Sequence, residues 1–186
     1  MIVLGIDPSL TATGLAVIDL DDILAPEVHT IASRPGDLPG INGRVQRQAR
    51  ICRQLLDLAT VALHQGPPLV VIEQPAYSSR TGHQHDRSGL WWRIVDRLLE
   101  HQADVVEVTP TSRARYATGK GNASKDQVLL AVAKRYPHVD VANNNEADAL
   151  VLAAMGADLA GRPLVDLPAT HRTALDKVVV PSGWAA

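Results

Sequence analysis

The first nineteen residues constrain the fold of this chain more than any other stretch. Residues 2–6 are apolar and mostly β-branched, which is typical of a buried strand, and they end at Asp7 followed by Pro8. A small polar turn and a second apolar run over residues 15–18 then predict a hairpin. Asp7 is unusual because a carboxylate at the end of a buried strand is costly without a partner. Two interpretations stay open at this point: Asp7 caps the turn, or it binds a metal ion.

A second acidic strand end follows later in the chain. Residues 69–72 form a continuous apolar run, as expected of a central strand, and this run ends at Glu73 before Pro75. Two strand-end carboxylates suggest a shared acidic site at one edge of a sheet. Asp148 lies early in the helix predicted over residues 146–159, where small residues favour close packing on the sheet. Asp148 either faces Asp7 and Glu73 or belongs to an ordinary acidic helix start.

The remaining pattern alternates strands and helices, which predicts a globular α/β fold. We expect strands over residues 28–33 and 105–108, helices over 42–64, 89–102 and 124–136, a loop over 110–122 and a short helix within 168–180. Trp92 points away from the apolar side of its helix, so it is either core or a contact with another subunit.

Composition excludes several protein classes for these 186 residues. No apolar run is long enough to span a bilayer, so no membrane association is expected. The single cysteine, Cys52, excludes an internal disulfide, is expected to lie in the core, and fits a reducing compartment. Since no signal peptide is evident either, we expect a cytoplasmic protein.

A local basic stretch lies inside a chain whose net charge is −2. Residues 109–136 contain a single acid, Asp126, against six basic residues: Arg113, Arg115, Lys120, Lys125, Lys134 and Arg135. Lys125 is in the first turn of a predicted helix, where a cation opposes the helix dipole, which favours a phosphate contact. Three carboxylates form a hard-oxygen site that suits Mg²⁺ or Mn²⁺. Two such ions can promote phosphodiester hydrolysis, and the basic stretch would then hold the phosphate backbone.

Four segments resemble the RuvC-type Holliday junction resolvases of the ribonuclease H-like superfamily. They are LGIDPSLTATGLAVID, VVIEQPAY, VTPTSRARYATGKGNASKDQV and EADALVLAA, and they occur in the order of that family. The resemblance implies a ribonuclease H-like fold, with a mixed five-stranded sheet flanked by helices. It also implies a homodimer that uses Mg²⁺, with two ions per site and Mn²⁺ as a substitute, to nick four-way junctions.

The resemblance also implies residue roles. By position, Asp7, Glu73 and Asp148 would be catalytic metal ligands, and Lys125 and Lys120 would contact DNA, as would Arg113 and Arg115 of the same basic segment. Tyr77 is the nearest candidate for an aromatic that stacks near the junction point.

One residue departs from the family pattern. Three residues before its final aspartate the family has an acid or a histidine, whereas this chain has Asn145. Asn145 shares a helix face with Asp148 and can offer a neutral carbonyl oxygen as the fourth ligand. Glu146 should point away, unless the helix begins irregularly and Glu146 reaches the site instead.

Two other functions compete with a junction endonuclease. One is a non-catalytic module that binds branched DNA on the same fold, which the Asn145 substitution favours. The other is a nucleotide-binding domain of the sugar kinase and actin type, which also opens with an Asp, Gly and Thr hairpin. On the resemblance, we expect a ribonuclease H-like nuclease domain over residues 1–161 and a C-terminal extension over 162–186 with a short helix and a loose tail.

Overall fold

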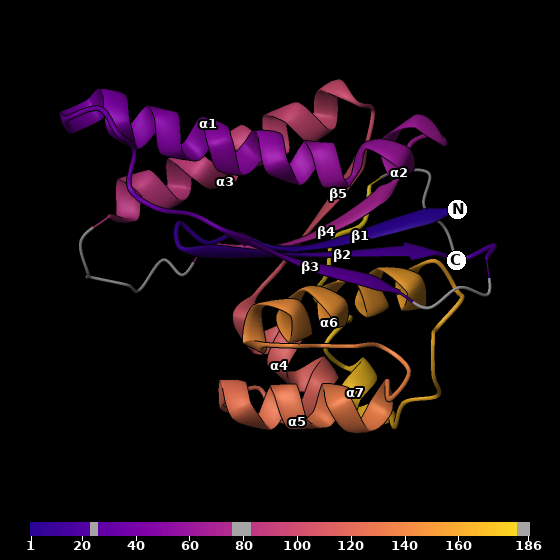
Figure 1. Cartoon of the computed structure of the whole chain (residues 1–186). Helices are drawn as coiled ribbons and strands as arrows, with labels where there is room; N and C mark the ends of the chain where they lie inside the picture. The colour runs from indigo at the N-terminus through magenta and orange to yellow at the C-terminus, as the bar shows by residue number, and fades with distance from the viewer. Residues whose placement is uncertain (23–25, 76–82, 182–186) are drawn as a thin grey trace.

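The chain folds around a mixed five-stranded sheet in a computed structural model, which describes residues 1–22, 26–75 and 83–181 (Figure 1). The strands are β1 (Ile2–Asp7), β2 (Ala12–Asp19), β3 (Glu27–Ala32), β4 (Leu69–Glu73) and β5 (Asp104–Val108). Their order across the sheet is β3-β2-β1-β4-β5. The first three strands are antiparallel, whereas β1, β4 and β5 run parallel. The predicted α/β architecture with a mixed five-stranded sheet flanked by helices is confirmed.

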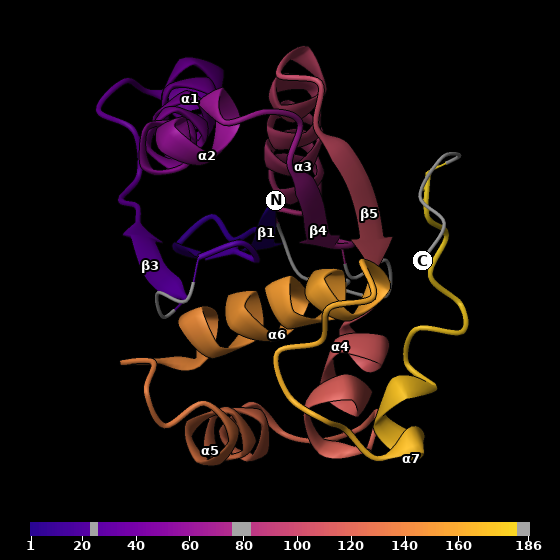
Figure 2. The same ribbon diagram turned by 90° about the vertical axis from the view of Figure 1, so that its right-hand side faces the viewer.

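Helices cover both faces of this sheet (Figure 1). On one face lie α1 (Gly40–Leu58), α2 (Thr60–His64) and α3 (Gln84–Glu100), and on the other lies α6 (Asn144–Leu159). Beyond α6 lie α4 (Pro110–Thr118), α5 (Lys125–Arg135) and the short α7 (Ala169–Arg172), as the turned view in Figure 2 also shows. The predicted core position of Cys52 is confirmed, because this residue of α1 is buried in the apolar core on that face of the sheet.

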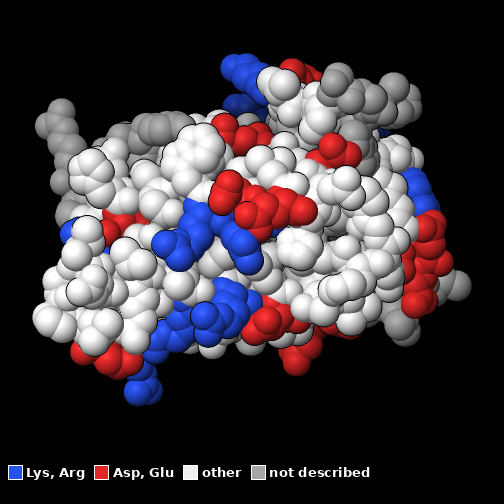
Figure 3. All heavy atoms as spheres, turned by 90° about the horizontal axis from the view of Figure 1, so that it is seen from above, with Lys and Arg blue, Asp and Glu red and all other residues white. Residues whose placement is uncertain are grey.

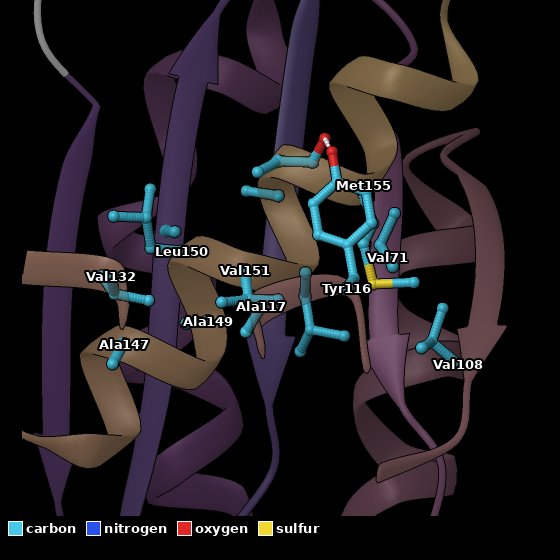
Figure 4. Close-up of a cluster of buried hydrophobic side chains, with 14 of the residues drawn as sticks. Val71, Val108, Tyr116, Ala117, Val132, Ala147, Ala149, Leu150, Val151 and Met155 are labelled. Carbon is cyan, nitrogen blue, oxygen red and sulfur yellow. Dashed lines mark hydrogen bonds between the residues drawn. The ribbon is translucent and has the colours of Figure 1, made fainter. Parts of the chain in front are cut away.

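Helix α6 packs unusually closely on the sheet because the strands beneath it contain glycine. A Cβ atom on Gly5 of β1 would lie 2.1 Å from the carbonyl oxygen of Ala149, and one on Gly14 of β2 would lie 2.1 Å from that of Asn145. On its other side α6 meets Tyr116 and Ala117 of α4, among small residues of its own (Figure 4). The predicted close packing of the Asp148 helix is thus confirmed.

Three predicted elements differ from the structure. The helix expected over residues 42–64 is divided into α1 and α2, and α3 begins at Gln84 rather than at residue 89. The loop expected over residues 110–122 is wrong, because α4 occupies Pro110–Thr118. Thr109 caps α4 by accepting a 3.0 Å hydrogen bond from the backbone N–H of Ser112, and Pro110 at the first helical position is pre-set for the turn. Local capping therefore makes a helix where apolar periodicity is weak.

The C-terminal segment packs against the domain. Ala174 is buried in the same core as α6, and several half-buried apolar residues join it: Leu164, Val165, Leu167, Leu175, Val178 and Val180. The short helix α7 lies within the stretch expected to contain one. The division after residue 161 stays a prediction, and the last residues, 182–186, lie outside the described part of the chain. Among the helices described, none has the length and apolar character needed to cross a membrane.

Candidate active site

Sheet topology brings the two strand-end carboxylates together. Ile6 of β1 pairs with Ile72 of the parallel strand β4, so Asp7 and Glu73 follow side by side at the same edge. Asp148 reaches this edge from the first turns of α6, directly behind them. The Asp7 residue is 8 % exposed and Asp148 is 1 % exposed. A cavity of about 220 Å³ opens over Asp7 and Glu73 and is also lined by Lys125 and Asn145. The predicted grouping of acids at one sheet edge is therefore present.

A buried arginine lies among these carboxylates. The guanidinium of Arg113, on α4, donates from Nε to Oε2 of Glu73 and from one terminal nitrogen to Oδ1 of Asp148. Arg113 is 6 % exposed, so its charge is held inside the protein. Burial alone would lower the pKa of Arg113, but the carboxylates of Glu73 and Asp148 outweigh it and raise that pKa. Sequence reasoning placed Arg113 on DNA, whereas its side chain is taken up by the two acids.

The acids repel one another despite this arginine. Burial, followed by the neighbouring charges of Glu73 and Asp148, raises the pKa of Asp7 from 3.8 to about 7. Burial also raises the pKa of Asp148 to about 6, against the opposing effect of Arg113. The carboxylate cluster thus carries more negative charge than Arg113 and Lys125 balance, which favours an additional cation.

The two candidates for a fourth ligand point in different directions. Asn145 lines the cavity together with Asp7 and Glu73. The carboxylate of Glu146 is turned toward β3, where it accepts hydrogen bonds from the Thr30 hydroxyl at 2.7 Å and from the backbone N–H of Ala142 at 2.7 Å. Helix α6 therefore begins regularly, with Asn143 as its cap, and Glu146 serves the packing of that end.

Lys125 lies at the mouth of the site rather than on a remote surface. Its ammonium nitrogen is 3.9 Å from Oδ2 of Asp148, while its side chain remains 63 % exposed. A capping box between Ser124 and Gln127 fixes the first turn of α5 that carries it. The predicted cap at Ser124 is confirmed. Lys125 can therefore meet an incoming anion without leaving the carboxylates.

Some neighbours of the site gave no signal in the sequence. The indole N–H of Trp91 on α3 donates to the backbone carbonyl of Glu73 at 3.0 Å and so holds the end of β4. Periodicity marks Trp91 only as a core residue. In the hairpin turn, Thr13 accepts from the N–H of Ser9 at 3.0 Å and donates to its carbonyl at 2.8 Å, which closes the loop beside Asp7.

The other predicted DNA contacts lie outside the cavity. Arg115 and Lys120 are exposed on α4 and on the turn that follows it. Tyr77 lies outside the described residues, so its role stays a prediction.

The donor chemistry of the site fits a divalent cation. Oδ2 of Asp148 is buried and has no hydrogen-bond partner among the described residues. A buried carboxylate oxygen that accepts no hydrogen bond, beside a second carboxylate, is a ligand set for Mg²⁺ or Mn²⁺. No group of three or more acidic, histidine or cysteine side chains within the described ranges already has the spacing of a closed metal centre. The guanidinium of Arg113 takes up the space between Glu73 and Asp148, so it has to release an oxygen before a metal ion can use it.

The sequence of this chain is similar to those of one group of enzymes. No family model matches the sequence. The crossover junction endodeoxyribonuclease RuvC of Parvibaculum lavamentivorans is 30% identical over 154 residues, which cover 81% of this chain and 82% of that protein. The protein of the same name from Chlamydia trachomatis serovar L2 is 28% identical over 91% of this chain and 97% of its own length.

Solved structures agree on the fold. The Thermus thermophilus RuvC structure has a TM-score of 0.65 and 22% identity, over 87% of this chain and 98% of that one. T. thermophilus RuvC in complex with a Holliday junction substrate has a TM-score of 0.61 and 23% identity, over 82% and 90%. The likeness confirms the predicted ribonuclease H-like fold.

Proposed function

The chain belongs to the RuvC family of crossover junction endodeoxyribonucleases, and we propose that it is itself a metal-dependent endonuclease that nicks Holliday junctions or related branched DNA. The observation that carries this proposal is the convergence of Asp7, Glu73 and Asp148 at one sheet edge beside an exposed lysine. The comparison with RuvC relatives confirms, at the level of the family, the resemblance to the RuvC-type resolvases found in the sequence.

The proposed cofactor is Mg²⁺, with Mn²⁺ as a substitute and two ions per site. Asp7, Glu73 and Asp148 would hold the ions through their carboxylates, and Asn145 would add a neutral carbonyl oxygen. When bound, such ions supply an activated water and stabilise charge on the leaving oxygen of a phosphodiester. Support comes from Oδ2 of Asp148, which is buried and accepts no hydrogen bond from the described residues, and from the raised pKa of Asp7, about 7.

The cationic side chains have separate tasks in this proposal. Arg113 balances the charge of Glu73 and Asp148 and keeps both carboxylates turned into the site while no metal is bound. Lys125 extends over the mouth of the cavity, where it would bind a non-bridging oxygen of the scissile phosphate and orient it. Arg115, Lys120 and Tyr77 are proposed to contact the DNA outside the cavity.

A homodimer is part of the proposal, since paired nicks need two symmetric sites. The face formed by α1 and α3 offers an uncovered surface for a second copy. Trp92 is 64% exposed there and Leu99, seven residues along α3, is 55% exposed. Figure 3 shows that basic and acidic side chains lie next to each other near the middle of this face, an arrangement suited to self-complementary pairing. The buried Trp91 belongs to the core, so Trp92 is the tryptophan proposed for the interface.

The competing functions differ in what an assay would detect. Family membership speaks against a nucleotide-binding domain of the sugar kinase and actin type. A non-catalytic module that binds branched DNA would bind junctions without cutting them, and the neutral Asn145 is the feature that favours it. The cytoplasmic location stays a prediction.

A nicking assay on four-way junction, flap and linear duplex DNA, with and without Mg²⁺, tests the proposal. We expect nicks in branched DNA only when Mg²⁺ is present. Asp7→Asn should lower the nicking rate by more than about a hundredfold, because several kcal/mol of charge stabilisation is lost, while junction binding is retained. Asp57→Asn, on the exposed side of α1, is the matched control and should cut normally. Junction binding by the wild type without any nicking would select the non-catalytic module instead.

A further inference from the structure

A second groove lies beside the candidate active site, on the side of β5. Its volume is about 400 Å³, and Gln74 lines both it and the active-site cavity. The backbone N–H of Gln74 donates to the carbonyl of Val108 at 2.9 Å, so the strand ends of β4 and β5 form the ridge between the two hollows. A chain molecule that crosses this ridge would occupy both.

The groove is lined by polar and basic groups from two distant parts of the sequence. Helix α4 contributes Thr111, Ser112 and Arg115, and the C-terminal segment contributes Lys177. Residues three and four apart on a helix share a face, so the two hydroxyls and the Arg115 guanidinium lie together, while Arg113 points inward to the carboxylates. Helix α4 thus contributes side chains to the carboxylate site from one side and to the groove from the other.

The two basic side chains of this groove are available to bind a ligand. Neither the Arg115 nor the Lys177 side chain has an ion pair or hydrogen bond with any of the residues that the structure describes. The groove contains one acid, Glu107, so its two basic residues leave it with a positive charge. By contrast, Arg113 and Lys125 on the neighbouring site face Asp148. The groove is therefore suited to an anion, and the active-site cavity to a cation.

The C-terminal segment that carries Lys177 is held in place. A ring nitrogen of His171 lies 2.9 Å from the carbonyl oxygen of Tyr116 on α4, and Ala174 is only 3% exposed. The backbone N–H of Val178 donates to the carbonyl of Leu175 at 3.0 Å. Lys177 is thus presented from a fixed turn opposite Arg115.

We propose that this groove binds a phosphate of the DNA strand next to the scissile phosphodiester, with Arg115 and Lys177 as its ligands and the hydroxyls of Thr111 and Ser112 as further donors. The ligand class is a phosphodiester, and the C-terminal segment becomes part of the DNA-binding surface. This inference rests on the proposed endonuclease function, because it assumes that the scissile phosphate lies at the carboxylate site and that the DNA strand continues from there into the groove.

Equilibrium binding to a four-way junction in metal-free buffer tests the ligands without cleavage. Arg115→Ala and Lys177→Ala should each weaken binding about fivefold to tenfold at low salt and reduce the slope of log affinity against log salt by about one. Lys177→Arg, which keeps the charge, should restore the wild-type slope. Arg162→Ala removes an exposed arginine that pairs with Asp21, lies outside both hollows and is not part of the basic stretch, so it serves as the control and is expected within about twofold of wild type. Wild-type affinity and slope in both alanine variants would overturn the proposal.

Neutral methylphosphonate linkages, placed one at a time around the cleavage position, test the location. For the wild type, a methylphosphonate at the scissile phosphate or at one neighbouring phosphate should lower the affinity for the junction. For the Arg115→Ala/Lys177→Ala double variant, a methylphosphonate at that neighbouring phosphate should no longer lower the affinity, whereas one at the scissile phosphate still should. If the double variant is sensitive at the same positions as the wild type, the groove does not bind the neighbouring phosphate.

Nicking by the wild type, measured in parallel, separates this inference from the proposed function. Nicking with unchanged binding in the variants means that only the groove is wrong. Loss of binding in the variants without any wild-type nicking means that the groove binds DNA on a non-catalytic module. Absence of junction binding by the wild type would overturn both.

Discussion

Asp7 is a buried carboxylate whose position costs folding stability. It ends β1 opposite Gly14, is 8% exposed and lies next to two further carboxylates. Burial and these neighbours raise its pKa from 3.8 to about 7. Because the folded protein favours the protonated form, ionisation of Asp7 at neutral pH costs folding free energy unless a cation is bound.

A pH series of unfolding measurements should detect this cost. The pKa of Asp7 is higher in the folded than in the unfolded chain, so its contribution is most favourable below about pH 4 and is lost as pH rises through about 7. Asp7→Asn removes this loss, so without divalent ions its stability relative to wild type should rise by about 2–3 kcal/mol from pH 5 to pH 8. Urea unfolding in a chelating buffer gives the difference, with Asp57→Asn as control. Parallel pH profiles for wild type and Asp7→Asn would mean that Asp7 stays ionised at no cost.

Asn145 and Glu146 are adjacent residues with opposite expected effects on metal use. Asn145 lines the cavity as a neutral oxygen donor, so Asn145→Asp should add negative charge and shift the Mg²⁺ dependence of nicking to lower concentration. Glu146→Gln should leave that dependence unchanged, because its carboxylate is bonded to Thr30 and to the backbone of Ala142. It should instead lower stability by about 1 kcal/mol.

A Mg²⁺ titration of the nicking rate for the three proteins makes this comparison. An inactive Glu146→Gln together with a silent Asn145→Asp would assign the fourth ligand to Glu146 and refute our reading of the helix start.

At the scale of elements, the site depends on how closely α6 approaches β1 and β2. Gly5 and Gly14 allow this approach, and Gly14 lies opposite Asp7 in the hairpin. Any side chain at these positions would displace the start of α6 and with it Asn145 and Asp148. The glycines therefore control the distance between proposed ligands that belong to different elements.

Gly14→Ala tests this dependence. Its Cβ would lie 2.1 Å from the carbonyl oxygen of Asn145, so the start of α6 must move, and we expect a loss of about 1–3 kcal/mol in stability together with slower nicking. Gly89→Ala on α3 is the control, because its Cβ would approach only the side-chain amide of Gln48, at 3.2 Å, and no backbone atom. Thermal unfolding and the Mg²⁺-dependent nicking rate are the measurements. Normal stability and rate in Gly14→Ala would show that α6 can shift without consequence.

At the scale of the whole molecule, the proposed homodimer has to bring two copies of the candidate site together. The face of α1 and α3 contains exposed apolar side chains, and the N-terminal end of α3 also lines the active-site cavity through Gln84 and Ser88. Pairing through this face would link the interface directly to both sites.

Trp92→Glu should therefore weaken the dimer at least about tenfold, since a buried aromatic is replaced by a charge in the proposed interface. Leu130→Glu, on α5 at the opposite side of the sheet, exchanges a similarly exposed apolar residue and should leave assembly unchanged. Sedimentation velocity, free and with junction DNA, reports the oligomeric state. A wild type that sediments as a monomer in both conditions would rule out the dimer.

The sequence by itself determined those features that repeat along a short stretch of chain. Continuous apolar runs marked the strands, Ser124 marked the start of α5, and the strand-end acids Asp7 and Glu73 marked one edge of the sheet. The helical spacing of Asn145 and Asp148 placed both on one face, because that geometry is local. These predictions agree with the structure since backbone geometry alone relates the residues.

Only the tertiary structure decided which side chains meet across long separations. Arg113 lies 40 residues from Glu73 and 35 from Asp148, and its burial between them depends on how α4 packs against α6. The same holds for Lys177 beside Arg115, and for Glu146 bonded to Thr30 across 116 residues. Local patterns record the preferences of single elements, whereas the direction of a long charged side chain is set by the elements that surround it.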